Sequence, residues 1–486
     1  MSTTDFLHGV EVLDIDDGPR SISVASSSVI GIVGTAPNAD PIAFPLNKPV
    51  LIAGSRKEAA KLVALSTSAD SGTLPDAIDS ILNQAKAVIV VVRVDVAQDA
   101  AAQRALVIGG TDANGNYTGL QSLMASEHEL GFKPRIVIAP GFTHQRVADG
   151  VSTLSVDTHG AGYTDGTYTL DVSGSGSGAG ALATAVVKNG AVSSCTLTRN
   201  GFHYTQPPTF AMPAAAGAPA EAAVFHATVG VVGNAVVGVL QGTILNSLRA
   251  IAIADGPGTT DADAIAYAGD FGSKRIYLVD PPVTKTDSSG NNVVSYASAC
   301  AAGLLAQIDN DKGFWWSPSN QIISGITGTA RPIDFTLGDT TSRANLLNAK
   351  NVATIIRQNG FRLWGNRTLS SDPKWAFLCV VRTADIIADS LQAAHLWAVD
   401  RGITKNYVSD VTEGVNAFLR SLTAKGAILG GKCWADPDLN APDQIAAGNV
   451  AFDFDFGAVN PAERVTFRSH MTNGYITSIF STSTGS

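Results

Sequence analysis

Three short apolar runs, each beginning with an arginine, constrain the fold of this chain more than any other feature. The runs span residues 135–140, 249–255 and 275–281, and they follow stretches of helical spacing at 119–130, about 237–248 and 261–269. Short apolar strands that alternate with helices are typical of a doubly wound domain with a largely parallel sheet. The sequence therefore predicts an α/β domain.

The first hundred residues extend the same pattern. Residues 28–34, 50–53 and 88–94 are expected to be strands, and residues 56–65 are expected to be helical. The run at 88–94 is dominated by valine and isoleucine, as in a strand buried on both faces. We assign residues 25–150 and 236–339 to one discontinuous α/β domain.

A nearly uncharged block, residues 151–235, interrupts the alternation. Its charged residues are Asp157, Asp165, Asp171, Lys188, Arg199 and Glu221. A Gly-x-x-Tyr-Thr unit occurs at Tyr163 and again at Tyr204, which indicates two copies of one β unit. Asn189-Gly190, between two strand-like segments, is a strong hairpin signal. We expect a β-rich domain inserted into the α/β domain.

The segment from 340 to 464 is predicted to be an α+β domain. Asp410 and Glu413 match a capping box at the start of a helix, and Gly426 matches the left-handed residue that ends one. The apolar stripe of this helix consists of Val415, Phe418, Leu419 and Leu422. Residues 450–456 alternate phenylalanine with aspartate, which favours a strand with one buried face.

The two ends of the chain read as arms rather than domains, at residues 1–24 and 465–486. Residues 10–16 form a short alternating strand with no adjacent core, and the stretch from 465 is a further strand or arm. The apolar residues of these arms, which would need a partner strand, are Val10, Val12, Leu13, Ile15, Val465, Phe467 and Ile476.

The composition favours self-assembly. Charged residues make up only 15% of the 486 residues, against about 25% in typical domains, so neighbouring copies are expected to cover part of the surface. The net charge of −9 argues against direct nucleic-acid binding. No apolar run is long enough to insert into a membrane, and the N-terminus lacks the order of a signal peptide. The four cysteines are far apart and are expected to be buried, reduced thiols.

No residue pattern supports catalysis, a cofactor or a metal. Residues 426–433 have Walker A spacing, but they follow a helix and carry Cys433 where serine or threonine should hold magnesium. The histidines show no metal-ligand spacing, and no GxSxG elbow occurs. Asp255 and Asp280 follow parallel strands and leave a nucleotide-binding α/β enzyme as the rival hypothesis. Tyr163 and Tyr204 leave a carbohydrate-binding module as a third.

Several motifs resemble one known family, the tail sheath proteins of contractile-tailed bacteriophages, R-type pyocins and related injection machines. The matching segments are 8–12, 29–37, 134–140, 250–257, 316–320 and 364–369, and the family motif comprises Trp364, Gly365, Arg367, Thr368, Trp375 and Arg382. The resemblance implies a multidomain, non-enzymatic sheath subunit with strand-exchanging terminal arms. It covers nearly everything outside the block at 151–235, which beside this family looks like an accessory domain that faces outward.

The resemblance also implies partners and a site. Copies would form stacked hexameric rings around the tail tube protein, bounded by baseplate and tail terminator proteins, and would contract to drive the tube through a bacterial envelope. The protein would be assembled in the host cytoplasm and reside in the virion tail. Residues 340–464 would be the inner domain, and its helix near 411–425 would face the tube. Glu413, Asn416 and Arg420 would lie opposite the apolar stripe of this helix, with Lys425 near its end.

Overall fold

The body of the molecule is a mixed α/β structure built on one nine-stranded sheet. The computed structural model describes residues 22–65, 70–174, 178–287 and 289–473. The strand order is β16-β19-β18-β13-β12-β4-β1-β3-β2. In that order the strands are Gln321–Ile322, Phe361–Trp364, Val352–Arg357, Ile276–Val279, Ile251–Asp255, Ile136–Ile138, Ile30–Thr35, Val88–Val94 and Pro49–Ala53. The strands from β18 to β3 are parallel and the edge pairs are antiparallel, so the predicted largely parallel sheet is confirmed.

Side chains of the parallel strands alternate between two apolar cores, one on each face of the sheet. In β3, Ile89 and Val91 face one core, and Val90 and Val92 face the other. The first core is covered by α2 (Leu74–Leu82) and α8 (Ala297–Asp311), and the second by α3 (Ala100–Ile108), α5 (Ala235–Val239), α6 (Leu245–Leu248), α7 (Asp261–Ala268) and α9 (Arg343–Asn348). The body is therefore doubly wound.

The helices expected in this body are present, with local variations. Residues 235–248 are helical throughout, with a π-helical turn, Leu240–Ile244, between α5 and α6. The stretch at 119–130 begins as a 3₁₀ helix, Gly119–Ala125, and continues as α4 (Ser126–Leu130). Residues 56–63 are α1 (Arg56–Ala59) followed by a 3₁₀ turn, Ala60–Val63.

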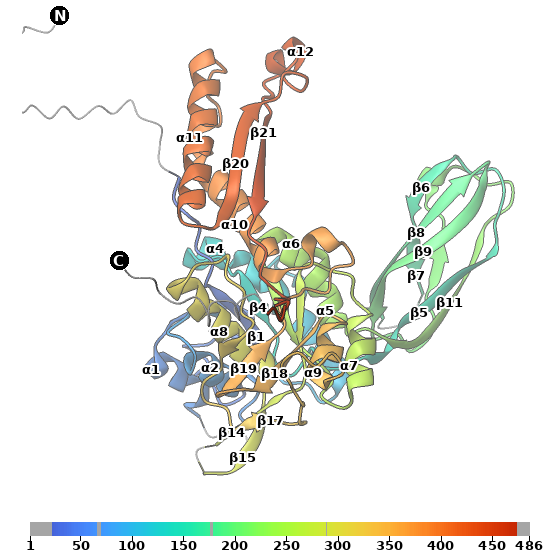
Figure 1. The fold of residues 1–486 in the computed structure, drawn as a ribbon. Helices are drawn as coiled ribbons and strands as arrows, with labels where there is room; N and C mark the ends of the chain where they lie inside the picture. Colours follow the sequence, from blue (N-terminus) through green and yellow to red (C-terminus); the bar gives the residue numbers. More distant parts are fainter. Residues whose placement is uncertain (1–21, 66–69, 175–177, 288, 474–486) are drawn as a thin grey trace, which may run out of the picture.

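The sheet extends beyond residue 339, where we expected the α/β domain to end. Strands β18 and β19 lie after that residue. Strand β18 pairs with β13, and β19 pairs with β18, so the domain boundary expected at 340 falls within the sequence that forms the sheet. A small separate sheet of β14 (Val283–Thr286), β15 (Asn292–Ser295) and β17 (Gly328–Thr329) lies below the body in Figure 1.

Residues 147–232 form a β-rich projection, which we call the β lobe (Figure 1, green). Its strands are β5 (Val147–Thr158), β6 (Gly166–Thr169), β7 (Asp171–Ser173), β8 (Ala179–Lys188), β9 (Ala191–Phe202), β10 (Thr209–Ala211) and β11 (Val224–Val232). Asn189 and Gly190 join β8 to β9 with φ values of 54° and 76°, which confirms the predicted hairpin.

Residues 378–458 form a second projection, which we call the hairpin module (Figure 1, orange). It contains α10 (Leu378–Ala394), α11 (Lys405–Ala424), β20 (Ile428–Ala435), α12 (Pro442–Ala446) and β21 (Phe452–Ala458). Strands β20 and β21 pair antiparallel as a two-stranded sheet.

The start of α11 differs from the expected capping box. The helix begins at Lys405, because the Thr404 hydroxyl accepts a hydrogen bond from the Tyr407 N–H, so the box at Asp410 and Glu413 is wrong. The end is as predicted: Gly426 has a φ of 74°, and the helix terminates there.

Candidate functional site: the hairpin module and its anchors

The core of the hairpin module is the apolar stripe of α11 packed on the β20–β21 sheet. Val415, Phe418, Leu419 and Leu422 are buried together with Cys433 of β20, and Phe452 and Phe456 of β21 pack against this cluster. The predicted stripe is confirmed. Burial of one helix face on two strands leaves the other helix face exposed to solvent.

The four predicted tube-facing residues differ in exposure and in their contacts. Glu413 and Arg420 are exposed and lie 3.9 Å apart as an ion pair, and Lys425 is exposed at the helix end. Asn416 does not project opposite the stripe, because its side-chain amide bonds both backbone groups of Cys433, at 3.1 Å and 2.8 Å. Its expected orientation is therefore wrong.

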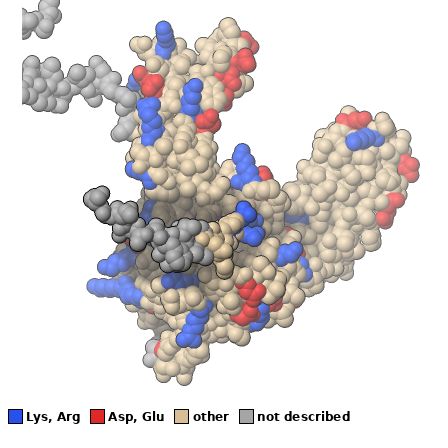
Figure 2. Space-filling view, in the orientation of Figure 1, with Lys and Arg blue, Asp and Glu red and all other residues tan. Residues whose placement is uncertain are grey.

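Charge is distributed unevenly over this module. Figure 2 shows basic residues along α11 and acidic residues gathered at the tip that carries α12. The carboxylates near the tip are Asp436, Asp438, Asp443, Asp453 and Asp455. Asp453 shares a hydrogen bond with Asp436, and this contact raises the pKa of Asp453.

Helix α10 fastens the module to the body through its aspartates. Asp389 pairs with Arg135, with Arg249 at 2.9 Å and with Lys133 at 3.4 Å, while Asp385 pairs with Arg275. Arg135, Arg249 and Arg275 are the residues that begin the three apolar runs of the sequence. They stand at the amino ends of β4, β12 and β13, so three neighbouring strands hold one helix.

These contacts are largely buried, which makes them structural rather than surface ion pairs. Asp389 and Arg135 are each less than a tenth exposed. Burial raises the pKa of Asp385, and the adjacent Arg275 opposes that change. Burying a charge is costly unless it is paired, so loss of any partner should weaken the attachment of the module.

Arg382 of the family motif supports the same attachment from α10. Its guanidinium pairs with Asp309 of α8 and donates to the Ser27 carbonyl at 3.1 Å. The Ala25 N–H also donates to the Ser390 hydroxyl at 2.9 Å. The chain just before β1 is therefore held along α10.

The remaining motif residues shape the turn after β19. Gly365 has a φ of 139°, and a Cβ there would lie 2.7 Å from the Cα of Ala353, so only glycine fits. The Thr368 hydroxyl donates to the Trp375 carbonyl at 2.9 Å, and the Trp364 carbonyl accepts from Asn348 at 3.0 Å. The Lys274 ammonium lies 3.8 Å from the centre of the Trp375 ring.

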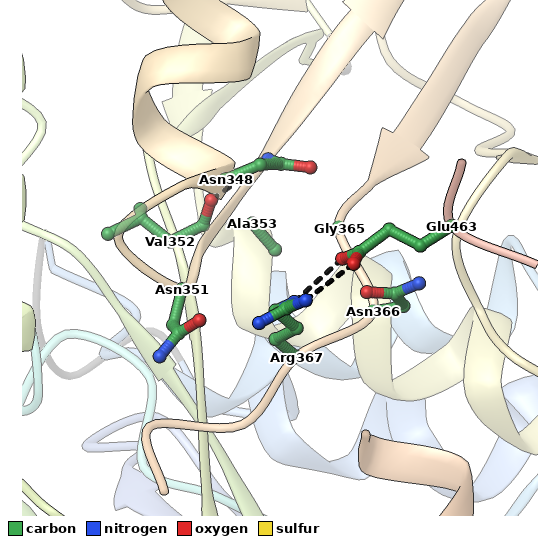
Figure 3. A pocket seen from close by; sticks show the side chains of 8 residues that line it. All are labelled: Asn348, Asn351, Val352, Ala353, Gly365, Asn366, Arg367 and Glu463. Carbon is green, nitrogen blue, oxygen red and sulfur yellow. Dashed lines mark hydrogen bonds and ion pairs between the residues drawn. The ribbon is translucent and has the colours of Figure 1, made fainter. Parts of the chain in front are cut away.

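Arg367 joins this turn to the segment that follows β21. Its guanidinium donates to both carboxylate oxygens of Glu463, at 2.7 Å and 2.5 Å (Figure 3). This bond raises the pKa of Arg367. The cavity beside the pair measures about 10 Å³, which is room for about one water molecule. The pair therefore works as an anchor rather than as a binding pocket.

The arms lie mostly outside the described residues. Residues 10–16, with Val10, Val12, Leu13 and Ile15, and also Ile476, fall there. Residues 459–473 are described and contain no strand, and in them Val465 is 67% and Phe467 92% exposed. The strand expected from residue 465 is thus absent in the described part of the isolated subunit.

The two acidic residues of the rival enzyme hypothesis are occupied by the protein itself. Asp255 accepts hydrogen bonds from the N–H and the hydroxyl of Ser298, at 2.7 Å and 2.6 Å. Asp280 accepts from the Gly258 N–H at 2.6 Å and pairs with Arg331. Burial raises the pKa of both carboxyls. Their geometry serves to hold loops at the carboxyl edge of the sheet.

The two repeat tyrosines are core residues, so the carbohydrate-stacking interpretation is wrong. Tyr163 is 7% and Tyr204 3% exposed. Each hydroxyl accepts a backbone N–H, from Ala223 at 2.9 Å and from Ala181 at 3.1 Å respectively. Each ring also packs over the glycine three residues earlier, Gly160 or Gly201, and these glycines have φ values of 65° and 66°.

The described part of the chain contains other features that the sequence raised as possible sites. Residues 426–433 follow the end of α11 and continue into β20, so they do not open a helix as a phosphate-binding loop does. All four cysteines are free; three are buried, and Cys195 is half-buried. Within the described ranges no three His, Cys, Asp or Glu side chains gather as a metal site. None of the helices there is long and apolar enough to cross a membrane.

Comparison with protein families and known proteins gives one consistent result. The models for the phage tail sheath protein central domain, the phage tail sheath C-terminal domain and the N-terminal region of tail sheath protein Gp18 domain III match residues 225–369, 370–472 and 27–94. A prophage major tail sheath protein of Pseudomonas aeruginosa (strain UCBPP-PA14) is 40% identical over 476 residues, and the tail sheath protein of Escherichia phage P2 is 30% identical over 483; the alignments cover 98% of every chain.

Solved structures resemble this chain in fold. The contracted helical sheath of the anti-feeding prophage matches with a TM-score of 0.59 at 14% identity, covering 96% of this chain and 100% of that one. The contracted sheath complex of the PVC extracellular contractile injection system matches with a TM-score of 0.55 at 14% identity, covering 97% and 99%.

Proposed function

We propose that this chain, which belongs to the phage tail sheath family and is therefore a structural sheath subunit rather than an enzyme, forms stacked hexameric rings around a tail tube. Contraction of these rings would drive the tube through a bacterial envelope during genome delivery. The alignments with two tail sheath relatives cover 98% of this chain and 98% of each relative, which supports the assignment of the same role to this chain.

The observation that carries this proposal is the unfinished sheet of the hairpin module. Strands β20 and β21 form a sheet of only two strands, and two-stranded sheets are marginal on their own. The described residues that follow β21, 459–473, include the alternating stretch Val465-Thr466-Phe467 and form no strand in their own subunit. An open sheet and an unpaired strand in one subunit are complementary between copies.

Both termini are proposed as exchanged strands. Residues 10–16 alternate in the same way as the segment from Val465, and the chain leading to them is held on α10 near Ser27. Helix α10 is part of the hairpin module, so the amino-terminal arm leaves the subunit close to the sheet that would receive such a strand in a neighbour.

The β lobe is proposed as an inserted accessory domain that faces outward. Its first and last strands pair with each other, and Val147 lies opposite Val232, so the chain enters and leaves the lobe at one place. Insertions of this kind are tolerated at surface loops. The lobe has its own apolar core, which includes Val151 and Leu170.

The exposed face of α11 is proposed to contact the tail tube. Arg420 and Lys425 supply positive charge, and the ion pair with Glu413 partly neutralises the charge of Arg420. Complementary charge would set the register of sheath on tube more than the affinity. Asn416 is committed to β20 and does not belong to this face.

Contraction would draw on energy stored in the lattice, because neither Asp255 nor Asp280 is free to serve a nucleotide. A metastable extended lattice would convert to a lower-energy contracted one after release at the baseplate. The α10 contacts would make the hairpin module and the body move as one rigid unit. Baseplate and tail terminator proteins would lie at the two ends of the sheath. The sheath would assemble in the host cytoplasm and become part of the virion tail.

Electron microscopy of the purified chain with its tube protein tests this proposal. We expect striated tubes. A variant that lacks residues 1–18 should stay folded but form no tubes, because that arm serves a neighbour. Monodisperse particles from the intact chain, or normal tubes from the truncated one, would contradict the proposal.

A further inference from the structure

A groove of about 530 Å³ lies where the β lobe joins the body. Figure 2 shows the hollow between these two parts of the molecule. Strands β8 and β9 form one wall of the groove. The helical turn after α5 and the loop between α7 and β13 form the other wall. Ligand sites commonly measure about 300–1,000 Å³, so the groove is large enough for a small molecule.

The lobe wall carries a cation without a partner. The β8–β9 ladder has a register shift beside Leu182, where Thr198 is an extra residue of β9 and forms a β-bulge. The bulge is followed by Arg199, and both Thr198 and Arg199 line the groove. The Arg199 guanidinium makes no hydrogen bond or ion pair with any other described residue. It is therefore available to bind an anionic group through its N–H groups.

The body wall carries an acceptor that lacks a donor. The turn Leu240–Ile244 is π-helical, and turns of this kind are frequent at functional sites. Gln241 lies in this turn and lines the groove. Its side-chain oxygen is buried and has no hydrogen-bond partner among the described residues. Buried polar groups are nearly always satisfied in native structures, so a bound molecule could supply the missing donor.

The rest of the lining is small and mostly polar. Thr198, Thr243 and Ser273 present hydroxyl groups to the groove. Gly238 adds open space, because a Cβ at this position would meet no other atom within 4 Å. Among the described residues of the lining, Arg199 alone is charged. A ligand with one negative charge and several hydroxyl groups would match this surface.

Ion pairs at the neck of the β lobe hold its wall against the body. Arg146 precedes β5 and donates to both carboxylate oxygens of Asp270, each at 2.6 Å. Arg104 of α3 pairs with Asp149 of β5 at 2.5 Å, and both side chains are less than a quarter exposed. The groove is thus formed before a ligand arrives, which removes the cost of ordering the site on binding.

We propose that this groove binds an acidic sugar, whose carboxylate pairs with Arg199 and whose hydroxyl group donates to the Gln241 side chain. A guanidinium binds a planar carboxylate through two parallel hydrogen bonds, and one cation balances one negative charge. The three hydroxyl groups of the lining suit a polyhydroxylated ligand. Binding here would be additional to sheath assembly and would not depend on it.

Titration of the full chain with sodium glucuronate, followed by saturation-transfer NMR, tests the ligand class. We expect saturable binding of glucuronate. Glucose lacks the acid and acetate lacks the hydroxyl groups, so each should bind about tenfold more weakly or less. Absence of glucuronate binding, or equal binding of acetate, would overturn the proposal. Tighter binding of glucose 6-phosphate than of glucuronate would overturn the assignment of the acid as a carboxylate.

Three variants locate the site. Arg199→Gln and Gln241→Leu should each lower the affinity for glucuronate about tenfold, because each removes one polar contact. Gly238→Leu should block the groove. It should still fold, because the site has room for a Cβ and leucine favours a helix more than glycine does. Thermal unfolding verifies that each variant remains folded.

Lys188→Gln is the matched control, since it removes one exposed positive charge at the far end of β8. Its affinity for glucuronate should equal that of the unaltered protein. An equal loss in Lys188→Gln and Arg199→Gln would show attraction by charge alone and would overturn the site. Normal glucuronate binding by Arg199→Gln together with poor tube formation would instead make the groove a contact between copies, which also contradicts the proposal.

Discussion

The Arg382 guanidinium donates hydrogen bonds to both carboxylate oxygens of Asp309, and the two side chains are only 3% and 1% exposed. The pair joins α10 to α8 and so fixes the hairpin module to the layer that covers the sheet. A buried pair tolerates joint replacement better than the loss of one member.

Removal of one member should therefore be costly. Arg382→Met is expected to lower the free energy of unfolding by about 3–5 kcal/mol, because it leaves Asp309 buried and unpaired. The double variant D309L/R382M should recover most of this loss. Urea denaturation of the three proteins provides the measurement, and equal losses in the single and double variants would contradict the assignment.

Asp255 predicts a specific dependence of stability on pH. Burial raises the pKa of Asp255 in the folded state. The contribution of its protonated form to the stability of the fold is therefore fully present below the unfolded-state pKa of about 3.9. This contribution is lost as the pH rises through the folded-state pKa. Asp255→Asn keeps the shape and the contacts with Ser298 but cannot ionise. The stability of this variant relative to the unaltered protein should increase between pH 4 and pH 8. A constant difference across this range would argue against a buried carboxyl.

The repeat tyrosines should prove structural. Tyr163→Phe and Tyr204→Phe are each expected to cost about 1 kcal/mol, since each leaves a backbone N–H without its acceptor. Tyr168→Phe is a matched control, because its hydroxyl donates to the Thr164 carbonyl in a more exposed setting. Thermal unfolding compares the three variants, and an equal effect at Tyr168 would contradict the buried-acceptor account.

The proposed tube face can be tested by charge. The variant R420E/K425E should form sheath-only polymers normally but co-assemble poorly with tube protein, more so at low salt, where screening is weakest. Reversal of Lys57 and Lys61 in the body is a control with the same change of charge. Sedimentation across a salt series measures co-assembly, and equal behaviour of the two variants would remove α11 from the tube contact.

Local patterns predicted the elements of the body well. The alternation of apolar runs and helices identified the parallel sheet because each strand is short and flanked by its own helix. The Asn189-Gly190 turn and the apolar stripe of α11 could also be predicted, because each is encoded by residues close together in the sequence. The helix start at Thr404 was missed because Asp410 has the same capping chemistry and lies nearer to the apolar stripe.

Contacts between distant residues could not be predicted in this way. Arg135 and Asp389 are 254 positions apart, and no periodicity links them. A signal was nevertheless present, since an arginine begins each of the three apolar runs and buried arginines need carboxylate partners. Asn416 has helical spacing like any exposed residue, and only the structure shows that its side chain bonds the backbone of Cys433.

Cryo-electron microscopy of assembled tubes tests the central claim most directly. At a resolution that traces the backbone, the β20–β21 sheet of each subunit should contain a further strand that belongs to another copy. If every subunit in the tube keeps a two-stranded sheet, with residues 464–471 paired to nothing, assembly by strand exchange is contradicted.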